Sequence, residues 1–389
     1  MRECRIVRLG DVCKQDRATI KTGERTDLRY IGLESIEPHT GQFNNGELSK
    51  TPEAPQANSF RFGTEHVLYG KLRPYLNKVA LADFEGKCST EIIPLRPAPE
   101  LDRRYLSYFL RSPLTVSRIS EKTSGARMPR ADMDFVLGLE INLPSSAEQR
   151  RIVDILSRAE GIVRLRREAE KKAAEMPPAL FLDMFGNPAT NPKRWPTKQL
   201  KAVAAIGSGN GFPIANQGKT EGNYPFYKVS DMNLPGNEVE MGMANNYITE
   251  DDRRVLKATA FKPGTVIFPK IGAAVSTNKK RLLTVASCFD NNVMGISPSD
   301  EITPSFMHAL MQGKNISDFA SDSNPPSIRK TTVEEWMIPI PPIDLQLVFD
   351  SRIQSIRSIQ AQQATATATA QAAFDTLLSQ AFAKTKNMG

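Results

Sequence analysis

Apolar residues with helical spacing occupy two long segments of the chain, one near the middle and one at the C-terminus. The stretch from Glu148 to Glu175 contains no proline and a single glycine, Gly161. Within it and just beyond, apolar residues recur at Ile152, Ile155, Ala159, Ile162, Ala169, Ala173, Met176 and Leu180. This spacing is typical of a heptad seam and predicts a central helix over residues 144–186. Pro177 and Pro178 lack amide donors, so we expect a kink or break there.

The second helical segment covers residues 342–389. Its apolar positions are Phe349, Ile353, Ile356, Ala370, Phe374, Leu377 and Ala381. Gln360, Gln363 and Thr367 interrupt this series in the middle. Two amphipathic helices separated by a globular domain can bury their seams most simply against each other. The pattern also allows the alternative in which each helix packs only on its own domain.

The regions that precede the two helices resemble each other, which indicates an internal repeat. VLYGKL, starting at Val67, returns as VIFPKI at Val266, and CSTEIIPLRP at Cys88 returns as CFDNNVMGISP at Cys288. The pair INLP and IPIP follows in the same order. Several matches in one order, at a spacing of about 200 residues, are not expected by chance.

Each repeat combines short apolar segments, turn residues and brief helical stretches, which is typical of a mixed α/β domain. In the second repeat, Thr303 can cap a short helix that has Pro304 at its first position and ends at Gly313. We therefore predict two tandem mixed α/β domains, at residues 1–143 and 187–341, separated by the two long helices.

Composition and charge favour a polyanionic partner. The 389 residues carry a formal net charge of +8, from 51 Lys and Arg against 43 Asp and Glu. Such a charge suits nucleic acid, although many proteins that bind none are as basic. The first residues are charged and no apolar run approaches a membrane span, so we expect a cytoplasmic protein. The four cysteines and three histidines are too scattered to suggest a metal site, and we expect reduced thiols.

Basic residues gather in loops near the repeated strand ends, in YGKLRPY, SGARMPRAD, FPKIG, NKKR and IRK. The candidates for contact with DNA are Lys71, Arg73, Arg127, Arg130, Lys270, Lys279, Lys280, Arg281, Arg329 and Lys330. Lysine binds phosphate, whereas arginine can also form two hydrogen bonds to a guanine edge. Each charge by itself is more often simply solvated, and recurrence at matching positions is what favours a DNA-facing role.

Two loops resemble catalytic motifs without meeting their requirements. SNPPSI contains the Asn-Pro-Pro of amino-methylating enzymes, but Ser327 stands where an aromatic ring should stack on a flipped base. The cluster GSGNGFP lacks the G-x-G-x-x-G spacing of a loop that holds a methyl donor. A self-sufficient DNA methyltransferase is therefore a disfavoured alternative, and we predict no catalytic residue. In the repeat, SNPPSI aligns with SGARMP as the loop before the last strand.

Together these features resemble the specificity subunit of type I restriction-modification enzymes over essentially the whole chain. The resemblance rests on VLYGKLRPYLNKVA, CSTEIIPLRP, SGARMPRADMDFVLGLEINLP with the following AEQRRIVDIL, and ALFLDMFGNP before Trp195. It implies two target-recognition domains and two helices that pair as an antiparallel coiled coil. It also implies that each domain reads one half of a bipartite DNA target, while the coiled coil sets the spacer between the halves.

The resemblance further implies a non-catalytic subunit of a larger complex. Two modification subunits would dock on the coiled coil and supply adenine-N6 methylation with S-adenosylmethionine. Restriction subunits would use ATP and Mg²⁺, so this chain is expected to bind no cofactor or metal itself. For the coiled coil and its partners we expect Ile152, Ile155, Ala159, Ile162, Phe349, Ile353, Ile356 and Phe374. A coiled-coil scaffold without a DNA role is the remaining alternative.

Overall fold

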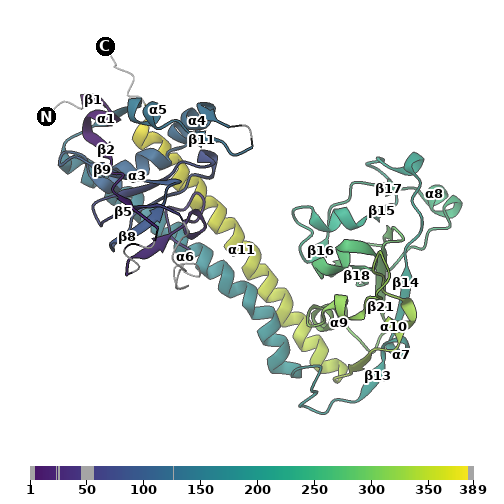
Figure 1. Ribbon diagram of the computed structural model, residues 1–389. Helices are drawn as coiled ribbons and strands as arrows, with labels where there is room; N and C mark the ends of the chain where they lie inside the picture. The colour runs from purple at the N-terminus through teal and green to yellow at the C-terminus, as the bar shows by residue number, and fades with distance from the viewer. Residues whose placement is uncertain (1–4, 23, 25–26, 45–56, 126, 384–389) are drawn as a thin grey trace. The chain divides into compact units, whose positions relative to one another are not determined.

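The chain divides into two compact units, each containing one of the two repeats. The computed structural model in Figure 1 describes all residues except 1–4, 23, 25–26, 45–56, 126 and 384–389. Unit 1 comprises Met1–Glu168 with Ala364–Gly389, and unit 2 comprises Ala169–Gln363. Because this division cuts both long helices, the segment boundaries expected after residues 143, 186 and 341 stay predictions.

Two four-stranded sheets form the centre of unit 1. The first has the order β2 (Cys13–Gln15), β9 (Ile92–Pro97), β6 (Val67–Gly70) and β7 (Val79–Ala80). The second has the order β3 (Thr19–Ile20), β5 (Ser59–Phe62), β8 (Gly86–Ser89) and β4 (Arg29–Ile31), with β4 and β8 parallel. Two antiparallel ribbons join β1 (Arg5–Arg8) to β12 (Glu140–Leu143) and β10 (Thr123–Ser124) to β11 (Arg130–Ala131). The apolar run in β6 is buried throughout, as expected of a strand covered on both faces.

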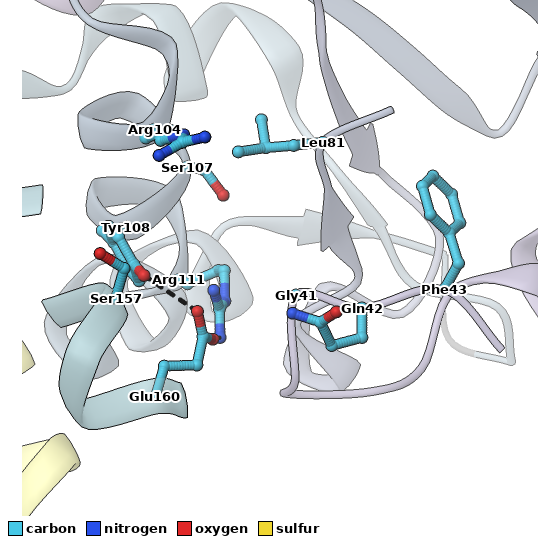
Figure 2. A pocket seen from close by; sticks show the side chains of 10 residues that line it. All are labelled: Gly41, Gln42, Phe43, Leu81, Arg104, Ser107, Tyr108, Arg111, Ser157 and Glu160. Atoms are coloured by element: carbon cyan, nitrogen blue, oxygen red, sulfur yellow. Dashed lines mark hydrogen bonds and ion pairs between the residues drawn. The ribbon is translucent and has the colours of Figure 1, made fainter. Parts of the chain in front are cut away.

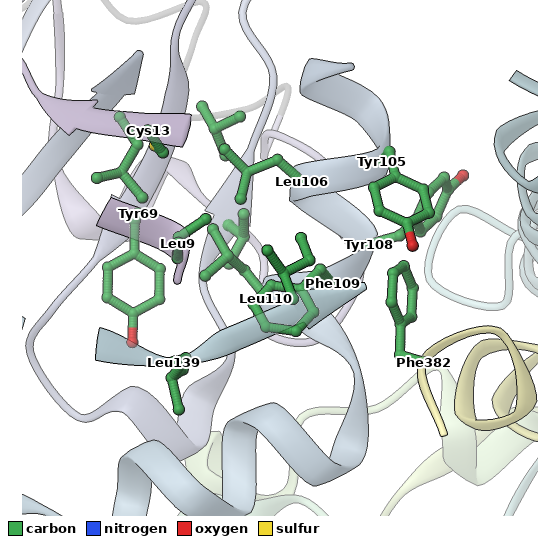
Figure 3. Close-up of a cluster of buried hydrophobic side chains, with 14 of the residues drawn as sticks. Leu9, Cys13, Tyr69, Tyr105, Leu106, Tyr108, Phe109, Leu110, Leu139 and Phe382 are labelled. Atoms are coloured by element: carbon green, nitrogen blue, oxygen red, sulfur yellow. The ribbon is translucent and has the colours of Figure 1, made fainter. Parts of the chain in front are cut away.

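Helices cover the first sheet of unit 1 and close its core. They are α1 (Leu9–Val12), α3 (Arg103–Arg111), α4 (Pro113–Glu121) and α5 (Met133–Gly138), with single 3₁₀ turns η1 (Leu33–Ser35) and η2 (Pro74–Leu76). The Asp102 carboxylate caps α3 by accepting from the amides of Arg104 and Tyr105, at 2.8 and 3.0 Å. Figure 3 shows the core that results, in which Leu106 of α3 lies near Leu9 of α1.

Unit 2 repeats this sheet arrangement. Its larger sheet has the order β14 (Ala204–Ser208), β21 (Val293–Pro298), β18 (Val266–Pro269), β19 (Arg281–Leu283) and β16 (Glu240–Met241). Its smaller sheet has the order β17 (Tyr247–Ile248), β15 (Tyr224–Tyr227) and β20 (Cys288–Phe289), and β13 (Thr197–Gln199) pairs with β22 (Met337–Pro339). The antiparallel series β14-β21-β18-β19 matches β2-β9-β6-β7, and β15 and β20 are parallel like β4 and β8. The internal repeat is therefore a repeat of strand topology.

The helices of unit 2 enclose a core rich in aromatic rings. They are α7 (Leu200–Val203), α8 (Glu250–Val255), α9 (Pro304–Gln312) and α10 (Lys330–Glu334), with 3₁₀ segments η3 (Ile214–Asn216), η4 (Val229–Asn233), η5 (Gly272–Thr277) and η6 (Ile316–Phe319). Helix α9 begins and ends as predicted, because Thr303 caps its first turn and Gly313 follows its last residue. Phe185 packs edge-on against Phe306 of α9 and against Phe349, with centroids 4.8 and 5.2 Å apart.

Two long helices, α6 (Ser146–Phe185) and α11 (Ile343–Phe382), run antiparallel along each other (Figure 1). In unit 1 their buried apolar residues are Val153, Leu156 and Val163 of α6 with Phe374, Leu378 and Phe382 of α11. In unit 2 they are Phe181, Met184 and Phe185 of α6 with Phe349 and Ile353 of α11. The seam expected for the second helix is confirmed in part, since Phe349, Ile353, Ile356 and Phe374 are all buried. Ala370, Leu377 and Ala381 are only partly buried, and Leu378 and Phe382 are the buried residues next to the last two.

The seam predicted for the first helix is wrong by one position in unit 1. Ile155 and Ile162 are 39% and 53% exposed, and Ile152 and Ala159 are only partly buried against the core. The buried series instead runs through Val153, Leu156 and Val163, and Glu160 occupies the position between them. Because Glu160 is charged and is bound by side chains of α3, a search for apolar residues at helical spacing does not find this buried series.

Of the kink or break expected at Pro177 and Pro178, the break is wrong, because α6 continues through both prolines, and the kink stays a prediction. In a helix the amide of residue 177 would donate to the carbonyl of Ala173, and proline leaves that carbonyl without its donor. The side-chain amide of Gln360, on α11, donates to the Ala173 oxygen at 2.8 Å. One of the polar residues that interrupt the second seam therefore replaces the hydrogen bond that proline removes.

A buried glutamine fastens the start of each long helix to the short helix before it. The Oε1 atom of Gln149 accepts from the amide of Asp102 at 2.8 Å, and its Nε2 donates to the carbonyls of Glu100 and Pro144 at 2.8 and 2.9 Å. Gln346 is wholly buried and makes the corresponding three bonds in unit 2, to Thr303, Glu301 and Pro341, at 2.9, 3.1 and 2.9 Å. Gln149 and Gln346 therefore form the same structural clamp in both repeats.

Candidate nucleic-acid interface

Backbone hydrogen bonds gather the basic loops of unit 1 at the end of β6. The amide of Lys71 donates to the Glu91 carbonyl at 2.9 Å, and the Lys71 carbonyl accepts from Ala131 at 2.8 Å. The amide of Arg73 donates to the Pro129 carbonyl at 2.7 Å, and Leu72 forms a bridge with Arg130. These bonds place YGKLRPY beside SGARMPRAD, so the structure brings together Lys71, Arg73, Arg127 and Arg130.

Unit 2 makes the same arrangement at the end of β18. We call the hydrogen-bonded loops at the end of β6 and at the end of β18 the platform of each unit. The amide of Lys270 donates to Asn292 at 2.8 Å, and its carbonyl accepts from Ile328 at 2.8 Å. The amide of Gly272 donates to Pro326 at 2.8 Å, and Ile271 forms a bridge with Ser327. SNPPSI is thus the structural counterpart of SGARMP, as the repeat predicts, and it lies beside FPKIG.

The side chains on the platform of unit 1 differ in how much they are engaged. Arg130 donates through Nε to both Glu91 carboxylate oxygens at 3.1 Å, and this bond raises the pKa of Arg130. Arg73 and Arg127 are exposed, and Lys71 is half-buried. Tyr75, which is 49% exposed, was missed at the sequence level, although it stands two residues after Arg73 in a basic loop. Exposed arginine and tyrosine are side chains that can hydrogen-bond to base edges or stack on bases.

In unit 2 the counterpart residues are more heavily engaged. The Lys270 ammonium donates to the Ser208 hydroxyl at 3.0 Å, and burial lowers the pKa of Lys270. Lys330 pairs with Glu334 along α10 at 3.5 Å, whereas Arg329 is exposed. Arg329 is therefore the more available charge on this platform.

The basic run 279–281 was expected to contact DNA, but its side chains are engaged within unit 2. Lys280 is wholly buried, its ammonium donates to Asn278 Oδ1 and to the Lys314 carbonyl at 2.6 Å, and burial lowers its pKa to about 8. Arg281 is half-buried and donates to the carbonyl of Met232 at 3.2 Å. Lys279 donates to the side chain of Asn233. Because these cations serve the fold of unit 2, we leave Lys280 and Arg281 out of the proposed interface.

A polar cavity of about 220 Å³ lies between α3, α6 and the loop at Gly41 in unit 1 (Figure 2). Arg111, almost fully buried, pairs with the Glu160 carboxylate, which also accepts from the Tyr108 hydroxyl at 2.9 Å. Gly41 has a φ of +72°, which L side chains rarely adopt, and a Cβ there would also contact the Arg111 guanidinium, so glycine is favoured at this place in the loop. The cavity walls thus form a charged joint between α3 and α6.

Among the described residues, His, Cys, Asp and Glu form no group of three that could hold a metal ion. Cys13, Cys88 and Cys288 are buried free thiols, and Cys4 lies outside the described residues. Within the same described part of the chain, no helix combines the length and apolar character needed to cross a membrane.

Comparisons with known proteins point to one family. Residues 1–175 and 192–358 match the family model described as the type I restriction modification DNA specificity domain. The chain is 21% identical over 335 residues to the MjaIX specificity subunit of Methanocaldococcus jannaschii, covering 80% of this chain and 76% of that protein. It is 28% identical over 124 residues to the EcoDI specificity subunit of Escherichia coli, which is 32% of this chain and 27% of that protein.

Solved structures share the fold of the chain. A chain from a structure on complex assembly and conformational transition of the type I R-M system matches with a TM-score of 0.64, at 21% identity, over 98% of both chains. The type I restriction-modification S subunit from M. genitalium matches with a TM-score of 0.54, at 17% identity, over 98% of this chain and 96% of that one. These identities are low, so the structural likeness speaks for the fold.

Proposed function

The chain belongs to the type I restriction-modification DNA specificity family, and we propose that it reads a bipartite DNA target, one half with each unit. The observation that carries the proposal is the duplicated platform, in which the same three backbone hydrogen bonds hold a basic loop at the end of β6 and of β18. A duplicated reading surface on one chain suits a target made of two separated halves.

The chemistry of the two platforms supports recognition of DNA over catalysis. Arg73, Arg127 and Arg329 are exposed cations. Backbone hydrogen bonds of Arg73 and of Ile328, which precedes Arg329, give the first and last of these side chains defined starting positions. Such groups contact phosphates or base edges, whereas bond-breaking chemistry needs a positioned acid, base or nucleophile. Specificity subunits are non-catalytic, and the methylation and cleavage of the complex would belong to partner chains.

We further propose that the long helices dock two modification subunits. Ile155 and Ile162 lie two turns apart on one face of α6, exposed and apolar, and Leu165 extends the same patch at 57% exposure. Ile359 of α11 follows Gln346 by the same number of residues as Ile162 follows Gln149, and it is 42% exposed. An exposed isoleucine at the equivalent position of both repeats suits two copies of one partner.

The proposed division of labour assigns the cofactors to those partners. S-adenosylmethionine would bind to the modification subunits, and ATP with Mg²⁺ to restriction subunits. This chain would contribute the DNA contacts and the helices to which the other subunits attach.

Methylome sequencing of a host that carries the complete system tests the main proposal. We expect adenine methylation at a bipartite motif that disappears when this gene is deleted and returns on complementation. A continuous motif, or a bipartite one that survives the deletion, would refute the proposal. Methyl transfer to DNA by the purified chain alone would support the methyltransferase alternative instead.

The docking proposal has its own test by co-purification. Ile162→Gln should weaken capture of the modification subunit by at least several-fold, because it places an amide in an apolar contact. Lys171→Gln, half a turn round the same helix, is the control and should leave capture unchanged. Equal capture by wild type and both variants would remove this face from the interface.

A further inference from the structure

At one equivalent position the two platforms have the same backbone conformation but different residues, Arg73 in unit 1 and Gly272 in unit 2. Arg73 has φ 52° and ψ 63°, the left-handed conformation that L side chains rarely adopt. Gly272, its counterpart by hydrogen bonding, has φ +76°. Glycine adopts this conformation freely, whereas an arginine there is strained by its own Cβ. Unit 1 therefore keeps a strained arginine where unit 2 shows that glycine suffices for the fold.

The strain at Arg73 is not offset by contacts of its side chain within the chain. Its guanidinium has no hydrogen-bond or ion-pair partner among the residues that the structure describes, and the side chain is exposed. A Cβ built on Gly272 would meet nothing within 4 Å, so a side chain at this place on the platform projects into open space. The amide of Arg73 donates to Pro129, and the amide of Gly272 makes the equivalent bond to Pro326. Because glycine makes this bond as well as arginine, the bond does not explain why residue 73 is an arginine.

Resting on the proposed function, we propose that Arg73 is a specificity-determining residue that reads a guanine in the half-site of unit 1. Its guanidinium would donate two parallel hydrogen bonds to the O6 and N7 atoms in the major groove. A phosphate contact needs only a nearby positive charge, and the exposed Arg127 offers one without a strained backbone. A base contact needs a defined origin and direction, which the paired backbone on both sides of Arg73 provides.

The same reasoning makes the two halves of the target unlike. Gly272 has no side chain, so unit 2 cannot make the corresponding contact. The guanine requirement assigned to Arg73 belongs to one half-site and has no counterpart at the equivalent place in the other.

The test uses the complex of this chain with its modification subunits and DNA duplexes that carry single-base changes in the target. Arg73→Gly should lose discrimination at one guanine by about 10- to 100-fold and keep it elsewhere. Arg73→Lys should keep the salt dependence and the affinity for duplexes changed at that guanine, but bind the unchanged duplex more weakly, because an ammonium cannot replace the planar fork. The Tm of Arg73→Gly should equal or exceed that of the wild type, since glycine relieves the strain.

Several outcomes would overturn the inference. A uniform loss of affinity with a shallower salt dependence in Arg73→Gly would make Arg73 a phosphate contact, and a lower Tm would make it a structural residue. Gly272→Arg is the matched variant and should lower the Tm, and an unchanged Tm would remove the argument from strain. If wild-type complex shows no sequence preference, the proposed function itself fails. If the wild type is sequence-specific and Arg73→Gly discriminates at every base as the wild type does, only the role of Arg73 is refuted.

Discussion

The buried glutamine clamp predicts a large loss of stability from an isosteric change. Gln346→Met keeps the shape of the side chain but leaves the amide of Thr303 and the carbonyls of Glu301 and Pro341 without their partners. Each buried group that loses its partner costs about 1–3 kcal/mol. With some relaxation, we expect unfolding free energy to fall by about 3–5 kcal/mol, at the upper end of single substitutions.

Tryptophan fluorescence during urea unfolding can measure this loss directly in unit 2. The chain has two tryptophans, Trp195 and Trp336, and both belong to unit 2. The midpoint for Gln346→Met should fall by about 1 M or more for a unit of this size. Gln354→Met, an exposed position on the same helix, is the control and should change stability by less than about 0.5 kcal/mol. A loss in Gln346→Met no larger than in this control would refute the account of the clamp.

Two further predictions concern polar groups inside unit 2. Gln360→Leu should lower the free energy of unfolding by about 1–2 kcal/mol in the wild type. In a Pro177→Ala background the loss should be small, because a backbone amide again reaches the Ala173 carbonyl. Equal losses in the two backgrounds, measured by urea unfolding, would contradict the proposal that Gln360 replaces that bond. Burial lowers the pKa of Lys280 to about 8, so the unfolded chain binds more protons between that value and about 10.4. Stability of the wild type relative to Lys280→Met should therefore rise as the pH increases through this window, and parallel pH profiles would contradict the burial of the ammonium.

Comparing the two repeats separates the features that maintain the fold from the side chains that differ between the two platforms. Both keep the glutamine clamp and the platform hydrogen bonds, which depend on the backbone and one buried side chain. They differ in the side chains that leave the platform, such as Arg73 against Gly272. This division lets one fold present two different reading surfaces, because exposed side chains can change at little cost to the core.

The sequence by itself determined the features that are local or repeated. Capping at Thr303 and termination at Gly313 follow from rules that act within one helical turn, and they predicted α9 correctly. The repeat was readable because each copy must bury the same strands, so apolar runs such as those at Val67 and Val266 recur. The same alignment predicted that SNPPSI matches SGARMP.

Only the tertiary structure decided the features that depend on partners distant in sequence. Glu160 can occupy the buried series of α6 because Arg111 and Tyr108 meet it there, and this shifts the seam by one residue. The helix passes Pro177 because Gln360 supplies a donor. No pattern along the chain encodes such pairs, since burial and hydrogen bonding depend on which segments meet in space. For the same reason the sequence marked Arg73 as basic, and the platform alone revealed it as a strained and unpaired arginine.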